Sequence, residues 1–209
     1  MSSNLTLPSI FNLGDIMSKT HITSDIHFSH ANIIKFCPES RPFRDADEMD
    51  RTIIFDWNKD VSPEDTTIIV GDVAFCSVEK AVHILNRLNG KKILVKGNHD
   101  FKLAKDEKFR NCFESIHEYL DMNFEQTKLV LFHYPIYEWD KMHHGSVHFH
   151  GHVHARPIPV NGRIYDVAMD GNQCRVYNLP ELIRYVKKHE IIRSHGDGDK
   201  HDKNRKKGQ

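Results

Sequence analysis

The chain has 209 residues, enough for one domain with a sizeable apolar core or for two small domains. Its 29 Lys and Arg residues balance 29 Asp and Glu residues, and this zero net charge argues against a protein whose main task is to grip a nucleic-acid backbone. Histidine is frequent, with 16 copies, and because neutral imidazole is the commonest metal ligand in proteins, the composition favours a metal site.

The sequence has none of the features expected of an exported or membrane-inserted protein. Its start lacks the basic and apolar regions of a signal peptide, and no segment approaches the roughly 20 apolar residues that span a bilayer. We therefore expect a cytoplasmic protein with no membrane partner. The cysteines form no CxxC pair and are expected to be isolated reduced thiols that pack rather than bind metal: Cys37, Cys76, Cys112 and Cys174.

The first half of the chain alternates short apolar strands with helices, after a flexible extension expected over residues 1–18. Apolar periodicity predicts one helix over 46–60, with Asp45 as its N-cap, and another over 78–88 that ends at Asn89 and Gly90. This alternation predicts parallel strands joined by crossover helices, as in an α/β domain. The strands are expected over 20–24, 66–70 and 92–95.

The second half is richer in strands and ends in a polar segment. From residue 190 onward the chain is rich in Gly, Asp and Lys without apolar periodicity, so we expect a disordered tail. Neither a repeat nor an internal linker is found, which predicts a single domain over 19–189. Strands are expected over 127–132, 146–149 and 163–169, and a helix over 180–188.

Polar side chains follow five of these predicted strands. Because ligands bind at the carboxyl ends of strands in open α/β sheets, we expect these side chains to converge in one crevice. Each short motif is weak evidence, since turns often use Gly, Asn and Asp. Five together are hard to explain as chance, because polar groups without partners are costly to bury. The set is Asp25 and His27; Asp72; Asn98, His99 and Asp100; His133; and His152 and His154.

In chain order these residues form the motifs DxH, GD, GNHD, a single His and GHxH, which resemble those of the calcineurin-like metallophosphoesterase superfamily. The resemblance covers residues 20 to about 188 and implies a four-layer α/β/β/α sandwich with a two-metal site at the strand ends. DIHFSH and GDVAFCS depart from the DxHG and GDxxDRG of the serine/threonine protein phosphatases. With RPF and HGHVH, they are more similar to small bacterial and phage metallophosphoesterases.

The resemblance also implies a metal-bridging hydroxide that attacks phosphorus in line. Oxygen and imidazole ligands favour Mn²⁺, with Fe, Zn²⁺ and Ni²⁺ as further candidates. The implied ligands are Asp25, His27 and His154 for one metal, Asn98, His133 and His152 for the other, and Asp72 between them.

The GNHD motif has one implied role for each residue. Gly97 allows a sharp turn after the strand, and Asn98 supplies a metal oxygen. His99 would face the scissile phosphate and stabilise charge or protonate the leaving oxygen. Asp100 would hold the His99 imidazole in its useful orientation.

Further residues are candidates for contacts with substrate. His30 would reach the phosphate from a helix start, or else contact only solvent. Arg41 and Arg44 would grip a second phosphate or a nucleotide, although a solvated loop pair is the simpler explanation. Tyr134 and Trp139 would stack on a base, although covering the edge of the core is the commoner role for such residues.

The leading hypothesis is a dinuclear-metal-dependent phosphoesterase that acts on a small phosphodiester or nucleotide-like substrate. A phosphomonoesterase or a nuclease on the same site is the alternative among enzymes. The nuclease is less favoured because the chain lacks the length and positive charge of DNA-gripping segments. A non-catalytic protein-binding scaffold would be expected to lose ligands or the catalytic His, whereas every expected position is filled here.

Overall fold

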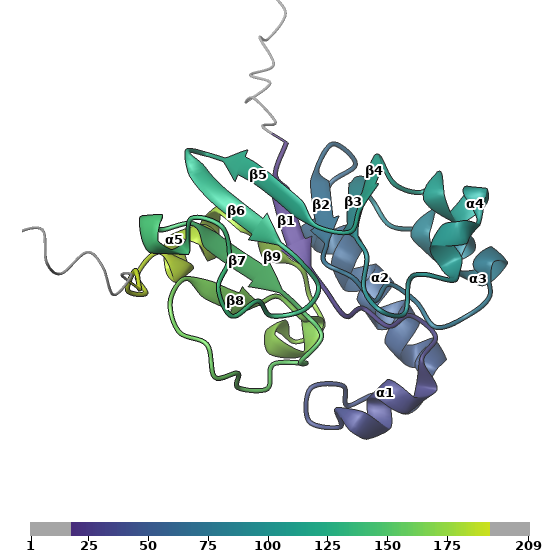
Figure 1. Ribbon diagram of the computed structural model, residues 1–209. Coiled ribbons are helices and arrows are strands. Elements are labelled where there is room, and N and C mark those ends of the chain that lie inside the picture. The colour runs from purple at the N-terminus through teal and green to yellow at the C-terminus, as the bar shows by residue number, and fades with distance from the viewer. Residues whose placement is uncertain (1–17, 193–209) are drawn as a thin grey trace, which may run out of the picture.

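The computed structural model describes residues 18–192, whose strands form two sheets packed against each other (Figure 1). The extension predicted over 1–18 and the tail predicted over 190–209 lie outside this range, apart from residues 18 and 190–192. None of the helices in the described range is long and apolar enough to cross a membrane.

The first sheet has the strand order β4-β3-β2-β1-β9. Strands β1 to β4 are mutually parallel, and β9 is antiparallel to β1. The parallel arrangement predicted for the first three strands is therefore confirmed, and their carboxyl ends meet at one edge of the sheet. The strands are β1 Thr20–Thr23, β2 Thr66–Ile69, β3 Lys91–Val95, β4 Ser115–His117 and β9 Tyr177–Asn178.

Helices cover the outer face of this sheet (Figure 1). The longest, α2, buries Met49, Ile53 and Trp57 at helical spacing, and the Asp45 carboxylate caps it by accepting from the Glu48 backbone N–H at 2.8 Å, as predicted. The helix predicted over 78–88 ends earlier because its last turn tightens into i→i−3 hydrogen bonds. The helices are α1 Ala31–Phe36, α2 Ala46–Asp60, α3 Val78–Leu85 and α4 Glu107–Arg110.

The second sheet has the order β5-β6-β7-β8, in which only β5 is antiparallel to its neighbour. Strands β4 and β5 were not expected from the sequence, because neither buries a side chain fully. The strand predicted over 163–169 ends at Asp166. After Asp166 the chain moves from β7 toward the first sheet, where Ala168 forms a bridge with Ser24, the residue that follows β1. The strands are β5 Leu120–Phe124, β6 Thr127–Leu131, β7 Val147–His150 and β8 Ile164–Asp166.

Apolar side chains from both sheets form the core between them, including Ile22, Val95, Leu131 and Phe149, all wholly buried. Helix α5 (Leu179–Val186) packs against the same core and contacts β1 and β9. A loop with the short 3₁₀ helix η2 (Met142–His144) packs against the second sheet through Trp139, which is 5% exposed. The predicted α/β/β/α sandwich is thus confirmed, and Trp139 belongs to the core rather than to a base-binding surface.

One histidine of β7 is buried as a neutral group. Both His148 ring nitrogens are satisfied, since Nδ1 donates to the Val130 carbonyl at 2.9 Å and Nε2 accepts from the Ile136 N–H at 3.1 Å. Burial is the main reason that the pKa of His148 falls to about 4. A proton added at Nε2 would break the bond from Ile136.

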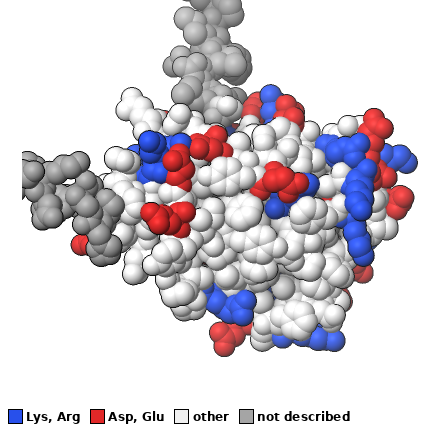
Figure 2. Space-filling model, in the orientation of Figure 1, with Lys and Arg blue, Asp and Glu red and all other residues white. Residues whose placement is uncertain are grey.

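Charged side chains of both signs are interspersed on the face of the molecule in Figure 2, around a broad uncharged area. This distribution agrees with the zero net charge of the whole chain. The face therefore lacks the continuous basic groove that binding of a long nucleic-acid backbone requires.

Candidate metal centre

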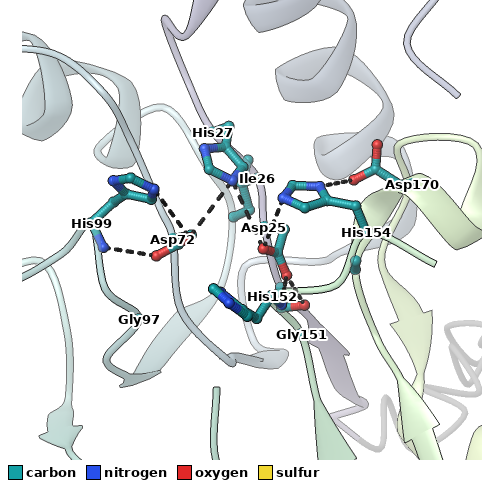
Figure 3. A network of polar contacts seen from close by, with 12 residues as sticks. Asp25, Ile26, His27, Asp72, Gly97, His99, Gly151, His152, His154 and Asp170 are labelled. Carbon is teal, nitrogen blue, oxygen red and sulfur yellow. Dashed lines mark hydrogen bonds and ion pairs between the residues drawn. The ribbon is translucent and has the colours of Figure 1, made fainter. Parts of the chain in front are cut away.

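The side chains at the strand ends converge where the two sheets meet (Figure 3). The Asp72 carboxylate, which follows β2, lies at the middle of the group. Its Oδ2 atom is 3.4 Å from Nε2 of His133, 3.7 Å from Nε2 of His27 and 3.9 Å from Nε2 of His99. Histidines that follow β1, β3 and β6 thus surround one oxygen of the carboxylate that follows β2.

A second buried carboxylate, Asp25, lies beside the first (Figure 3). Its Oδ2 atom accepts from the Ser24 hydroxyl at 2.7 Å and from the His152 backbone N–H at 2.9 Å. Its Oδ1 atom is 3.4 Å from Nε2 of His154 and 3.8 Å from Nε2 of His27. Within residues 18–192, Asp25 Oδ1 and His27 Nε2 are buried without a hydrogen-bond partner. Because such atoms are costly to bury, they fit the role of metal ligands.

The Asn98 amide brings two further imidazoles into the group. Its Oδ1 atom is 3.1 Å from Nε2 of His133 and 3.1 Å from Nδ1 of His152. The opposite nitrogen of His133, Nδ1, donates to the Val70 carbonyl at 2.8 Å, which fixes the ring with Nε2 facing the site.

The backbone is strained where these side chains meet. Asp25, His27, Asp72, His152 and His154 have φ values of 52°, 55°, 57°, 72° and 51°, in the left-handed region that residues with a Cβ rarely adopt. Such strain costs about 1–3 kcal/mol per residue and clusters at functional sites.

Two glycines allow the loops to approach these carboxylates closely. A Cβ atom at Gly97 would overlap the Asp72 carboxylate, and one at Gly151 would overlap the Asp25 carboxylate and the Ser24 side chain. Position 97 therefore has to be a glycine because no Cβ fits beside Asp72, and the residue also makes the turn after β3.

The electrostatics of the group favour a cation at its centre. Burial by itself would raise the pKa of Asp72, but the hydrogen bond and charge of His133 hold it at about 2. Burial by itself would lower the pKa of His133, but Asp72 and Asp25 raise it to about 9. The two carboxylates thus favour positive charge at this point of the group, which a divalent cation would supply.

Among the described residues, three groups of three have ligand atoms within 4.8 Å of one another, and two of them consist of predicted metal ligands: Asp25–His27–His154 and Asp25–Asp72–His133. These two groups share Asp25 and between them contain five of the seven predicted metal ligands. The other two, Asn98 and His152, contact the second group as described above.

A third such group consists of Cys37, His154 and Asp170. Its carboxylate is already engaged by His154, since Nδ1 of that ring donates to Asp170 Oδ2 at 2.8 Å. Burial also raises the pKa of the Cys37 thiol, whereas metal binding requires a thiolate. We therefore assign no metal to this group.

The structure corrects the role predicted for Asp100. This carboxylate is wholly buried and accepts from the backbone N–H groups of Gly97, Asp72 and Val73 at 2.8, 2.8 and 2.9 Å. Within the described range it makes no hydrogen bond to the His99 imidazole, because both of its oxygens are engaged by these amides. Asp100 instead ties the loop after β2 to the loop after β3, and burial raises its pKa to about 6.

His99 lies at the open side of the group. Its backbone N–H donates to Asp72 Oδ1 at 3.0 Å, which anchors the residue, while its side chain remains 38% exposed. The ring is 5.6 Å from the ring of His27 and 5.3 Å from that of Phe75. An exposed imidazole on a fixed backbone is well placed to meet a substrate.

Arg41 does not have the role in substrate binding that was considered for it. Its side chain is wholly buried, and its guanidinium donates to both oxygens of Asp170, at 2.9 and 2.8 Å. It also donates to the backbone carbonyls of Ile26 and Asp25, at 2.9 and 2.5 Å. Arg41 therefore supports the loop that carries Asp25 and is shielded from any ligand.

Asp170, in the 3₁₀ helix η3 (Met169–Asn172), is a site residue that the sequence reasoning missed. It accepts from Arg41, from the Ser40 hydroxyl at 2.7 Å and from Nδ1 of His154, which leaves Nε2 of that ring facing Asp25 (Figure 3). A signal was present, since Asp170 directly follows the strand predicted over 163–169.

Of the other residues predicted to contact substrate, Arg44 lies in solvent and His30 lies beside the site. Arg44 is exposed, and its side chain contacts Asp45 at 2.9 Å, in keeping with the simpler explanation of a solvated pair. The His30 ring stacks on Phe75 with centroids 4.4 Å apart, and its Nδ1 is 3.2 Å from Nδ1 of His27. His30 therefore borders the site.

Tyr134 also borders the site, on the side of His152. The centroids of these two rings are 4.6 Å apart, and Tyr134 is 38% exposed. Tyr134 therefore lies at the surface beside a predicted metal ligand.

Known proteins are similar to this chain in sequence. The family model of calcineurin-like phosphoesterases matches residues 18–126. Over 189 residues the chain is 31% identical to the uncharacterized protein MJ1445 of Methanocaldococcus jannaschii, covering 87% of this chain and 98% of that protein. Over 169 residues it is 25% identical to the Gene 66 protein of Mycobacterium phage L5, covering 68% of this chain and 80% of that protein.

The fold is also found among solved structures. The crystal structure of the protein of unknown function AQ665 from Aquifex aeolicus matches with a TM-score of 0.65 and 24% identity, over 80% of this chain and 99% of that chain. The chain therefore belongs to the calcineurin-like phosphoesterase family and is a hydrolase that acts on phosphoric esters.

Proposed function

We propose that the protein is a two-metal phosphodiesterase that hydrolyses small or nucleotide-like phosphodiesters. The observation that carries this proposal is the pair of buried carboxylates, Asp25 and Asp72, surrounded by imidazoles. Asp25 Oδ1 and His27 Nε2 are buried without a hydrogen bond within residues 18–192, and a cation would supply the partner that they lack.

The donors divide into two sets with Asp72 between them. Asp72 Oδ2 lies 3.7 Å from His27 on one side and 3.4 Å from His133 on the other. Oxygen and nitrogen donors without thiolate favour Mn²⁺ over thiolate-selected ions. Two divalent ions would lower the pKa of a water nucleophile and neutralise the charge of the phosphate. One ion would be held by Asp25, His27 and His154, the other by Asn98, His133 and His152, with Asp72 shared.

The leaving oxygen needs a proton, and His99 is the group that we assign to supply it. Its ring is exposed beside Asp72, and its backbone is anchored to that carboxylate. A general acid at this position lowers the barrier most when the leaving alcohol is a weak acid. His99 therefore matters more for an alkyl ester than for a p-nitrophenyl ester.

The test is Mn²⁺-dependent hydrolysis of bis-p-nitrophenyl phosphate and p-nitrophenyl phosphate by metal-stripped, reloaded protein. We expect diester turnover and its loss in Asp72→Ala. His99→Ala should lower turnover of these p-nitrophenyl esters by less than the roughly 10²–10⁴-fold expected for a diester with an alkyl leaving group, which is assayed beside them. The control is His83→Ala, at an exposed position of α3. Turnover of the monoester alone would favour a phosphomonoesterase. No turnover by folded protein loaded with Mn²⁺, Zn²⁺, Fe²⁺ or Ni²⁺ would refute the proposal.

A further inference from the structure

Aromatic rings lie at the surface on the His99 side of the centre. Phe75 is 51% exposed and Phe101 is 50% exposed. His30 already stacks on Phe75, with an angle of 22° between the ring planes, and His99 meets the Phe75 ring edge-on at 74°. Neighbouring exposed apolar rings beside a reactive group mark a surface that binds a ligand.

These rings line a hollow with a volume of about 530 Å³. This size is typical of pockets that bind small organic ligands. Most of the wall is apolar, and a few polar side chains contribute to it. The hollow is lined by Phe75, Phe101, Leu103, Asn98, His99 and Lys102, among others.

We propose that this hollow binds the leaving group of the phosphodiester, and that the leaving group carries a flat aromatic ring, as a nucleoside does. The inference rests on the proposed function. If His99 protonates the leaving oxygen, the group attached to that oxygen lies on the His99 side, where the hollow is.

The chemistry of the wall favours a nucleobase over an alkyl chain. A base has flat faces that can stack on rings such as Phe75 or Phe101, and polar edges that suit Lys102. An alkyl chain offers neither flat faces nor polar edges to this wall.

The charge distribution limits the size of the ligand. The chain has zero net charge, and both signs are interspersed on the face in Figure 2, which argues against affinity from contacts to many phosphates. Stacking of one base beside the scissile bond would add affinity to the contacts between the phosphate and the metal centre. The substrate is therefore a dinucleotide or another short nucleotide diester.

The experiment uses Mn²⁺-loaded protein, dithymidine monophosphate and two analogues, each lacking one of the two thymine bases. The leaving alcohol is a sugar hydroxyl in every case, so its acidity barely changes, and the products show which side leaves. We expect kcat/KM to fall at least about tenfold when the base on the leaving side is absent. Removal of the other base should have a smaller effect.

Phe75→Ala and Phe101→Ala should each lower kcat/KM for the full dinucleotide by a larger factor than for the analogue without the leaving-side base. Both side chains are half exposed, so the fold tolerates their removal. The matched control is Phe55→Ala, a residue of α2 that is 69% exposed and lies outside the wall of the hollow.

The outcomes separate this inference from the proposed function. Equal turnover of all three substrates, or a larger effect of the base on the other side, would overturn the inference. So would hydrolysis of bis-p-nitrophenyl phosphate without hydrolysis of any dinucleotide. In each of these cases the phosphodiesterase stands. Absence of all diester turnover refutes the proposed function itself.

Discussion

Replacing Asp170 by asparagine should weaken both the fold and the affinity of the candidate centre for metal. The Asp170 and Arg41 side chains are 1% and 0% exposed, and they form a two-point ion pair. The asparagine side chain would have the same shape without the charge, so the guanidinium would stay buried with no counter-charge. Breaking a buried pair in this way costs about 3–5 kcal/mol in the free energy of unfolding.

The effect on metal binding has a different origin. Nδ1 of His154 donates to Asp170 at 2.8 Å, and this bond directs Nε2 toward Asp25. Loss of a carboxylate that orients a metal-binding histidine typically lowers metal affinity by about 10–100-fold. Urea unfolding of the metal-free protein measures the first effect, and calorimetric titration with Mn²⁺ measures the second.

Asp60→Asn is the matched control. Its carboxylate also accepts from an arginine at two points, with one bond of 2.8 Å to Nε of Arg175, but the two side chains are 21% and 41% exposed. An exposed pair contributes about 1 kcal/mol or less, and this one should leave Mn²⁺ binding unchanged. The reasoning fails if Asp170→Asn unfolds within about 1 kcal/mol of the wild type and binds Mn²⁺ equally well.

Three further results are expected. Burial lowers the pKa of His148 from about 6.5 to about 4, so on acidification the imidazole binds a proton in the unfolded chain before it does in the folded protein. Roughly 3 kcal/mol of the free energy of unfolding should therefore be lost as the pH falls from 7 to 4. In urea unfolding, His148→Gln should reduce this dependence on pH, and the same dependence in the variant and the wild type would contradict the expectation. Gly97→Ala should abolish diester turnover because its Cβ overlaps the Asp72 carboxylate, while Gly171→Ala, whose Cβ meets only the end of a tyrosine side chain, should retain activity. Mn²⁺ at about 100 times its Kd should stabilise the wild type by about 2.7 kcal/mol in thermal unfolding, and Asp25→Asn should lose most of that gain.

Much of the architecture and of the candidate centre could be predicted from the sequence. Alternating strands and helices indicate parallel strands, whose carboxyl ends meet at one edge, so residues that directly follow the strands must converge. Asp25 and Asp72 come together for this reason, whereas His133 follows β6 of the second sheet and joins them because the two sheets pack together. Strands β4 and β5 were missed because their half-buried side chains leave little apolar pattern.

Only the tertiary structure decided which partner each charged group has. Arg41 and Asp170 are separated by 129 positions, and nothing near either one shows that they pair. The sequence near Asp100 likewise does not show its partners, because its hydrogen bonds from the backbone amides of Asp72 and Val73 depend on how two loops pack. Local sequence determines where strands end and which side chains follow them, because backbone periodicity is local. The partner of a buried charge depends on burial and on contacts between distant segments, which exist only once the chain has folded.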